Sequence, residues 1–292
     1  MNAHQDLGMA DMGVNGVTGP AVIAEGPYRR LFKFHRVAAK YRPSNSSRPT
    51  APPDETYFTA WAQEVIVPEL ARYKGQQPLA EIWNEPNLAY EWGDQEPDPA
   101  YYARMLRAIY PVIKAAVPDA IVVTAGLSTV GTDIFMPNAM DDATFLRGMY
   151  DAGAKGYFDA VGTHPYGFGR APEHGGEILS FRRAEQQQAI LAEKGDPGRA
   201  MVATEFGWIR NPADSGRPDC LAHPSWNGRA WQVVSPQRQA EYTVRAYQYA
   251  YNNWPWMIGM FLFILDWPTG PDGCDQMGYY AIKNQPAEAA FR

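Results

Sequence analysis

Stretches with the pattern of buried β-strands alternate with helical patterns along most of this chain. The strand-like stretches are residues 31–37, 80–85, 120–125, 157–164, 201–207 and 257–265, and helices are predicted between them at about 54–74, from 98 onward, and at 142–154, 181–194 and 236–253. Strands that alternate with helices form βα units around a parallel sheet. The pattern therefore predicts an α/β fold of the (β/α) barrel type, as one domain over residues 31–292.

Residues 1–30 break this alternation. Glycines at positions 8, 13, 16 and 19 interrupt any period, and only residues 21–24 have the pattern of a strand. We therefore expect an irregular amino-terminal segment at 1–30.

The charge and the apolar runs exclude two classes of partner. The net charge is −6, and the chain has no basic cluster, which argues against nucleic acid. The longest apolar run, residues 256–265, is too short to span a bilayer and has the pattern of a buried strand. We expect neither nucleic acid nor a membrane as partner.

Polar side chains follow three of the predicted strands at the points where those strands end. Pro86 ends one strand directly after Glu85, His164 and Tyr166 follow another, and Glu205 ends a third. The carboxyl ends of parallel barrel strands converge on one rim, which is where barrel enzymes place their chemistry. Two carboxylates that face each other across a pocket are what glycoside hydrolysis requires.

Each of these residues also has a purely structural interpretation. Glu85 could cap a turn, and Glu205 could form an ion pair at the end of its strand. His164 could be a core histidine bonded to the backbone, and Tyr166 could serve packing alone.

The motifs around these strand ends resemble glycoside hydrolase clan A, the retaining (β/α)8 TIM-barrel β-glycosidases. Asn-Glu-Pro at 84–86 and Thr-Glu-Phe-Gly at 204–207 look like the two signature strands of that clan. With His-Pro-Tyr-Gly at 164–167 and Phe-Leu-Arg-Gly-Met-Tyr at 145–150, the chain is similar to family 39 and to related family 5 enzymes. The resemblance covers about residues 31–290.

The resemblance implies a role for each residue in a retaining β-glycoside hydrolase. Glu85 would be the acid/base and Glu205 the nucleophile of a double displacement. Asn84 would bind the sugar 2-hydroxyl, and Tyr166 would donate a hydrogen bond to Glu205, with His164 in the same network. The charge on Glu205 would keep Glu85 protonated until the sugar esterifies Glu205.

Aromatic rings near the strand ends are candidates for stacking on a sugar ring. Trp208 and Trp267 lie closest to predicted strand ends, and Phe263 competes with Trp267 for the end of the last strand. Loop aromatics also pack the interior of loops, which is the alternative for both tryptophans. The resemblance implies a carbohydrate substrate, no metal and no organic cofactor.

The amino terminus departs from the clan pattern. If residues 80–85 form strand four of the barrel and residues 31–37 form strand three, only residues 1–30 remain for strands one and two. Two βα units need roughly 60 residues. We expect a barrel that is incomplete or altered at strands one and two. Its open edges would favour a homo-oligomer. The alternatives are a non-catalytic carbohydrate-binding protein derived from a truncated glycosidase barrel, and a fragment that needs a partner chain.

Two cysteines leave the compartment open. Cys220 and Cys274 are too few for a structural zinc site made of thiolates. They could form a disulfide, which would favour secretion into an oxidising compartment, or remain free thiols. No signal peptide is visible, which by default suggests the cytoplasm.

Overall fold

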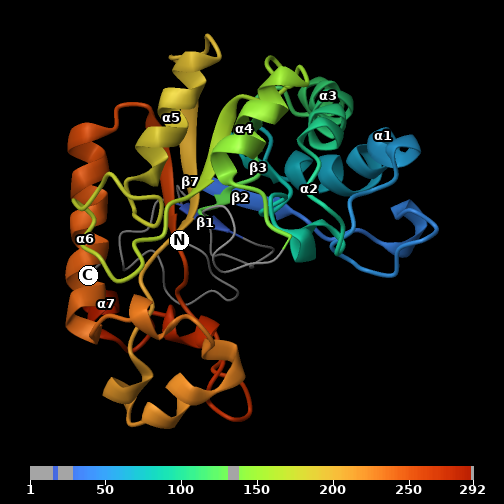
Figure 1. Ribbon diagram of the computed structural model, residues 1–292. Coiled ribbons are helices and arrows are strands. Elements are labelled where there is room, and N and C mark those ends of the chain that lie inside the picture. The colour runs from blue at the N-terminus through green and yellow to red at the C-terminus, as the bar shows by residue number, and fades with distance from the viewer. Residues whose placement is uncertain (1–15, 19–28, 131–137, 291–292) are drawn as a thin grey trace. The chain divides into compact units, whose positions relative to one another are not determined.

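The computed structural model describes residues 16–18, 29–130 and 138–290 (Figure 1). Contacts along the chain divide it into two compact units. The first, here called the sheet unit, comprises Arg29–His164 and Glu185–Thr204. The second, here called the disulfide unit, comprises 16–18, Pro165–Ala184 and 205–290 among the described residues. Most of the expected irregular segment, including the strand at 21–24, lies outside the described residues, and the domain boundaries stay a prediction.

Parallel strands build the sheet of the sheet unit. In spatial order they are β2 (Arg29–Phe34), β3 (Leu79–Ile82), β4 (Ile121–Thr124), β6 (Ala160–His164) and β7 (Ala200–Phe206), with the short β5 (Leu127–Ser128) paired to β6. Every pairing among them is parallel. All four residues of β3 are buried, as expected for a strand covered on both faces. The carboxyl ends of these strands lie at one edge of the sheet.

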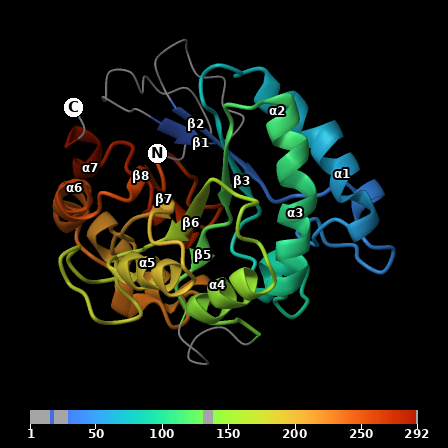
Figure 2. The ribbon, with the colours of Figure 1, turned by 90° about the horizontal axis from the view of Figure 1, so that it is seen from above.

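Helices separate these strands, as the sequence predicts. They are α1 (Phe58–Trp61), α2 (Val67–Ala71), α3 (Pro99–Ala116), α4 (Asp142–Asp151) and α5 (Arg183–Glu193), with the 3₁₀ turns η2 (Ala39–Tyr41), η3 (Glu55–Tyr57) and η5 (Ala89–Trp92). Figure 2 shows α3 lying beside α1 and α2, which it contacts. The predicted cap of α3 is present, because the Asp98 carboxylate accepts the N–H of Tyr101 at 2.8 Å.

The predicted helix at about 54–74 is present as helical turns without a break from residue 55 to 71, capped by Asp54, but it is not a regular α-helix. The segment is instead a 3₁₀ turn, α1, a π-helical turn η4 (Ala62–Ile66) and α2 in succession. Pro68 has no N–H to donate to the carbonyl of Glu64, and its ring would collide with that carbonyl in a regular α-helix. In the π turn Val67 N–H bonds to Ala62 O, five residues back. Apolar periodicity cannot detect a single extra residue in a turn.

The barrel is incomplete, as predicted. Within the described residues, β1 (Gly16–Thr18) is the one element that precedes β2. Parallel strands that alternate with helices, but lack the first βα units, are those of an incomplete (β/α) barrel.

The disulfide unit holds the last elements of the chain. They are α6 (Pro236–Asn253), β8 (Met257–Leu262) and α7 (Pro286–Ala289), with the 3₁₀ turns η6 (Pro212–Ser215), η7 (Pro218–Ala222), η8 (Pro224–Trp226), η9 (Ala230–Gln232) and η10 (Gln276–Tyr279). In Figure 1, α7 lies against α6, and the two are in contact. The predicted cap Ser235 accepts the N–H of Arg238. An apolar core that includes Phe181, Phe206, Trp208 and Trp254 fills the unit.

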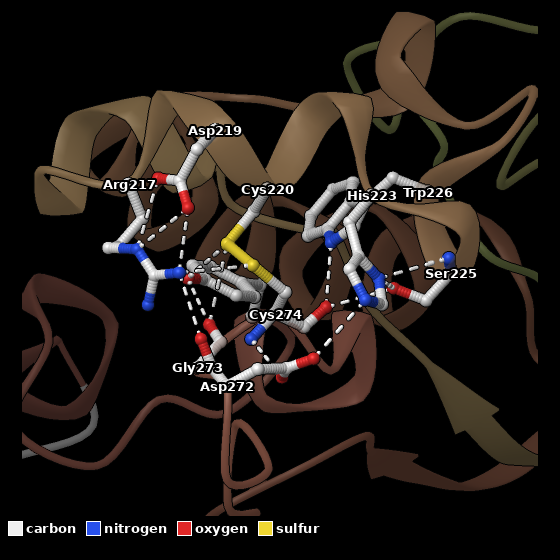
Figure 3. A network of polar contacts seen from close by, with 10 residues as sticks. Arg217, Asp219, Cys220, His223, Ser225, Trp226, Asp272, Gly273 and Cys274 are labelled. Atoms are coloured by element: carbon white, nitrogen blue, oxygen red, sulfur yellow. Dashed lines mark hydrogen bonds and ion pairs between the residues drawn. A yellow bond between two sulfur atoms is a disulfide. The ribbon is translucent and has the colours of Figure 1, made fainter.

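Cys220 and Cys274 form a disulfide, which is one of the two alternatives that the sequence left open. The bond ties η7 to the loop after β8, across 54 positions of sequence. Figure 3 shows the polar contacts around it: Arg217 donates to the carbonyl of Asp272 at 2.8 Å, and the Trp226 indole donates to the carbonyl of Cys274 at 2.9 Å. Two long loops of the unit are thereby held together.

Among the described helices, none combines the length and the apolar character that crossing a bilayer requires.

Candidate active site

The carboxylate of Glu85 stands just past the end of β3 on an unusual backbone. Trp83 and Glu85 have φ values of +81° and +41°, in the left-handed region that non-glycine residues seldom adopt. The Trp83 indole holds this turn by donating to Glu91 O at 2.7 Å, and its ring packs edge-on against Trp61 and Trp92. Backbone strain held in place by packing is typical of functional sites.

His164, at the end of β6, is the partner of Glu85. Its Nδ1 lies 2.9 Å from Glu85 Oε1, and its Nε2 lies 3.0 Å from the hydroxyl of Thr204. The ring is fully buried, and the Glu85 side chain is 14% exposed. The alternative of a core histidine bonded only to the backbone is therefore wrong, because both ring nitrogens meet side chains.

Two charged residues beside this pair were missed by the sequence reasoning. Glu81 on β3 is fully buried, and Lys33 on β2 lies with its ammonium 3.5 Å from Glu81 Oε2 and 2.6 Å from Asn84 Oδ1. A lysine between two phenylalanines, and a glutamate inside a buried apolar strand, were the signals available. Charged residues are seldom fully buried unless they are paired.

Glu81 is held in its ionised form. Burial alone raises the pKa of its carboxyl group, but the charge of Lys33 and the nearby His164 ring, whose Nε2 lies 3.6 Å from Glu81 Oε1, outweigh burial and leave the pKa below its usual value. The peptide N–H of Gly126 and the hydroxyl of Thr204 add hydrogen bonds to Oε1 at 2.9 and 2.7 Å.

Glu205 lies in the disulfide unit with a partner of its own. The phenol of Tyr166 donates to Glu205 Oε2 at 2.7 Å, so the predicted hydrogen bond is confirmed. A hydrogen bond donated to a carboxylate favours its charged form. The structure therefore brings together Glu85 and His164 in the sheet unit, and Tyr166 and Glu205 in the disulfide unit.

Phe263 directly follows β8, which places it rather than Trp267 at the end of that strand. Its ring packs against those of Tyr166, Tyr280 and Trp267, with centroids 5.8–6.3 Å apart. Trp267 is half-buried, and its indole N–H lies 3.3 Å from Asp275 Oδ2. These rings form an aromatic cluster next to the Tyr166–Glu205 pair.

Trp208, a candidate for stacking on a sugar, is instead buried. It is 1% exposed, and its indole donates to Arg170 O at 2.7 Å. The rings of Phe181, Phe206 and Tyr242 pack around it. Since protein covers its ring, Trp208 serves the core of the disulfide unit.

One cluster of possible metal ligands exists in the part of the chain that the structure describes. It consists of Asp219, Cys220 and Cys274. The two sulfur atoms are bonded to each other, so neither can act as the thiolate ligand that a zinc ion requires.

Comparisons with known proteins support the fold. No family model and no curated protein matches this sequence. Among solved structures, the chain is similar to a family 39 glycoside hydrolase from the gut symbiont Bacteroides cellulosilyticus WH2, with a TM-score of 0.63 and 17% identity over 97% of this chain and 58% of that chain. It is also similar to a GH39 β-xylosidase from Caulobacter crescentus, with a TM-score of 0.57 and 19% identity over 90% of this chain and 54% of that one.

A GH53 catalytic domain from Ignisphaera aggregans is matched over 97% of this chain and 86% of that chain, with a TM-score of 0.58 and 15% identity. Solved structures that share this fold thus include family 39 enzymes, the family that the motifs resemble. The chain spans little more than half the length of the two family 39 structures.

Proposed function

We propose that this protein is a retaining β-glycoside hydrolase, with Glu85 as acid/base and Glu205 as nucleophile. The observation that carries the proposal is that the two carboxylates have different hydrogen-bond partners. Glu205 accepts the phenol proton of Tyr166, which favours the ionised form that a nucleophile needs. Glu85 faces an imidazole nitrogen, with which it can share a proton.

The reaction then has two displacements. Glu85 gives its proton to the departing glycosidic oxygen while Glu205 attacks the anomeric carbon and forms a covalent glycosyl ester. Glu85, now a carboxylate, takes a proton from water, which attacks the ester and releases the sugar with its β configuration. Asn84 binds the 2-hydroxyl, and the aromatic cluster around Phe263 and Trp267 offers rings for stacking on the sugar.

A panel of aryl β-glycosides, including the xyloside and the glucoside, tests the proposal. We expect Glu205→Ala to lower kcat/KM by about 10⁴-fold or more, because it removes the nucleophile. Glu85→Ala should lower it by about 10²–10⁴-fold on substrates with poor leaving groups, where protonation matters most. Glu193→Ala is the matched control, since Glu193 is exposed and pairs with Arg147 on the surface.

Azide separates the two roles by the product that it forms. In Glu205→Ala, azide fills the space of the lost carboxylate and attacks from that face, so an α-glycosyl azide is expected. In Glu85→Ala, azide attacks the covalent intermediate in place of water, so a β-glycosyl azide is expected. Sugar binding without turnover on any substrate would instead support a non-catalytic carbohydrate-binding protein.

The disulfide also supports a proposal about location. The bond between Cys220 and Cys274 favours an oxidising compartment, because cytosolic thiols are normally kept reduced.

A further inference from the structure

Three buried polar side chains of the sheet unit have no part in the reaction proposed above. Lys33, Glu81 and Thr204 are 12%, 0% and 0% exposed, and they reach Glu85 through His164. Buried charges are costly, so a chain that keeps them at a strand end invites the question of what they hold in place.

The Glu81 carboxylate accepts both of the hydrogen bonds that reach its Oε1. Both Gly126 N–H and Thr204 O–H approach Oε1, and an ionised carboxylate can only accept. Oε2 makes no hydrogen bond within the described residues, and the Lys33 ammonium lies 3.5 Å from it. Lys33 is therefore the charge that compensates the buried carboxylate.

This direction determines where the protons of His164 lie. The single hydroxyl proton of Thr204 is donated to Glu81, so Thr204 can only accept from His164 Nε2, at 3.0 Å. Nε2 then carries the N–H. In a neutral imidazole this is the one N–H, so Nδ1 is an acceptor that faces Glu85 Oε1 at 2.9 Å, whereas an imidazolium would donate from both nitrogens.

Lys33 also orients the side chain of Asn84, because it donates a hydrogen bond to it. An ammonium group only donates hydrogen bonds, so the atom of Asn84 that faces it at 2.6 Å is the amide oxygen. The NH₂ group of Asn84 is then turned away from Lys33 and is the part of the side chain that can donate to a ligand hydroxyl.

We propose that Lys33 and Glu81 are positioning residues, which hold His164 as its Nε2–H tautomer and thereby make Nδ1 the hydrogen-bond acceptor that faces Glu85. The strand register supports this, because Lys33 and Glu81 are direct partners across β2 and β3. What that acceptor does for an acid/base at Glu85 rests on the proposed function, but the tautomer itself does not.

The test is ¹⁵N NMR of the full chain with labelled histidine side chains near pH 7. The chain has five histidines, and the His164 signals are assigned by their absence from His164→Gln. We expect the Nε2–H tautomer in the wild-type protein. An Nδ1–H tautomer or an imidazolium there would overturn the proposal, and this measurement needs no other variant to fold.

Lys33→Met should reverse the chain of hydrogen bonds. Without its cation the buried Glu81 takes up a proton and donates it to Thr204, whose hydroxyl then donates to His164 Nε2. His164 is left as the Nδ1–H tautomer, so the ratio of tautomers should change by at least about tenfold. Lys40→Met, which removes an exposed lysine of the same unit, should leave the ratio unchanged.

A folded Lys33→Met protein that keeps the Nε2–H tautomer would contradict the proposal. Thr204→Val provides a second variant, since it cuts the link but keeps both charges, and the His164 preference for Nε2–H should again be lost. Because these signals are read without substrate, an inactive protein with the Nε2–H tautomer would refute the proposed function alone.

Discussion

At the end of β3 the backbone adopts a costly conformation at two positions, Trp83 and Glu85. Left-handed φ values at non-glycine residues cost about 1–3 kcal/mol each. The buried Trp83 indole, with its hydrogen bond to Glu91 and its contacts with Trp61 and Trp92, keeps the turn in place. Packing free energy is thus used to present the Glu85 carboxylate, which a relaxed turn would direct elsewhere.

Stability at acidic pH should depend on Glu81. Its pKa is lowered in the folded protein from an ordinary value of 4.5, so the unfolded chain binds the proton more readily. The stability that the ionised carboxyl group contributes is complete above pH 4.5 and is lost as the pH falls below that value through the folded pKa. In Glu81→Gln the free energy of unfolding should fall less steeply there, by up to about 1.4 kcal/mol per pH unit.

Urea unfolding at a series of pH values between 3 and 6 measures this slope. The exposed glutamate Glu96 of the same unit gives the matched control, Glu96→Gln. Equal slopes in Glu81→Gln and the wild-type protein would show that Glu81 does not carry this dependence. At neutral pH, Glu81→Gln should also be less stable by about 3–5 kcal/mol, because it leaves Lys33 without its counter-charge.

At the scale of elements, the close approach of β4 and β6 depends on a glycine. A Cβ added at Gly162 would lie 2.2 Å from the backbone oxygen of Thr124, which cannot move aside. The N–H of Gly162 also bonds to the Thr124 hydroxyl at 3.0 Å. The two strands, and with them the position of His164 at the end of β6, require this residue to be small.

The loops of the disulfide unit should depend on the Cys220–Cys274 bond. Closing a loop of 54 positions lowers the entropy of the unfolded chain and is worth about 4 kcal/mol in the loop-closure model. The double variant Cys220→Ser, Cys274→Ser should lose about 2–4 kcal/mol of unfolding free energy. Denaturant unfolding with and without dithiothreitol measures the loss.

The double variant serves as the control for the reductant, because it should not respond to dithiothreitol. A wild-type protein that unfolds at the same denaturant concentration under both conditions would contradict the expected stabilisation.

At the scale of the whole molecule, an incomplete barrel leaves strand edges that other chains can pair with. We expect self-association, so light scattering at micromolar concentration should give a multiple of the chain mass of 32.6 kDa. Ile258 on β8 is 42% exposed, and a charge at an exposed strand position opposes pairing. Ile258→Lys should shift the distribution towards the monomer, and a purely monomeric wild-type protein would refute the expectation.

Patterns local in sequence were enough to predict much of this protein. The alternation of strands and helices, the caps Asp98 and Ser235, and the shortage of strands at the amino terminus were all correctly expected, because each depends on neighbouring residues. The strand-end positions of Glu85 and Glu205 were expected only approximately, because β3 ends at Ile82, three residues before Glu85, and β7 continues to Phe206, one residue past Glu205.

Only the tertiary structure decided which side chains meet. Lys33 and Glu81 are 48 positions apart, and it is the register of β2 against β3 that makes them partners. Trp208 was a candidate for stacking on a sugar, with packing as the alternative, and the rings of Phe181 and Tyr242 show that it packs in the core. Burial and pairing across strands are sums over distant contacts, and no local pattern of residues contains them.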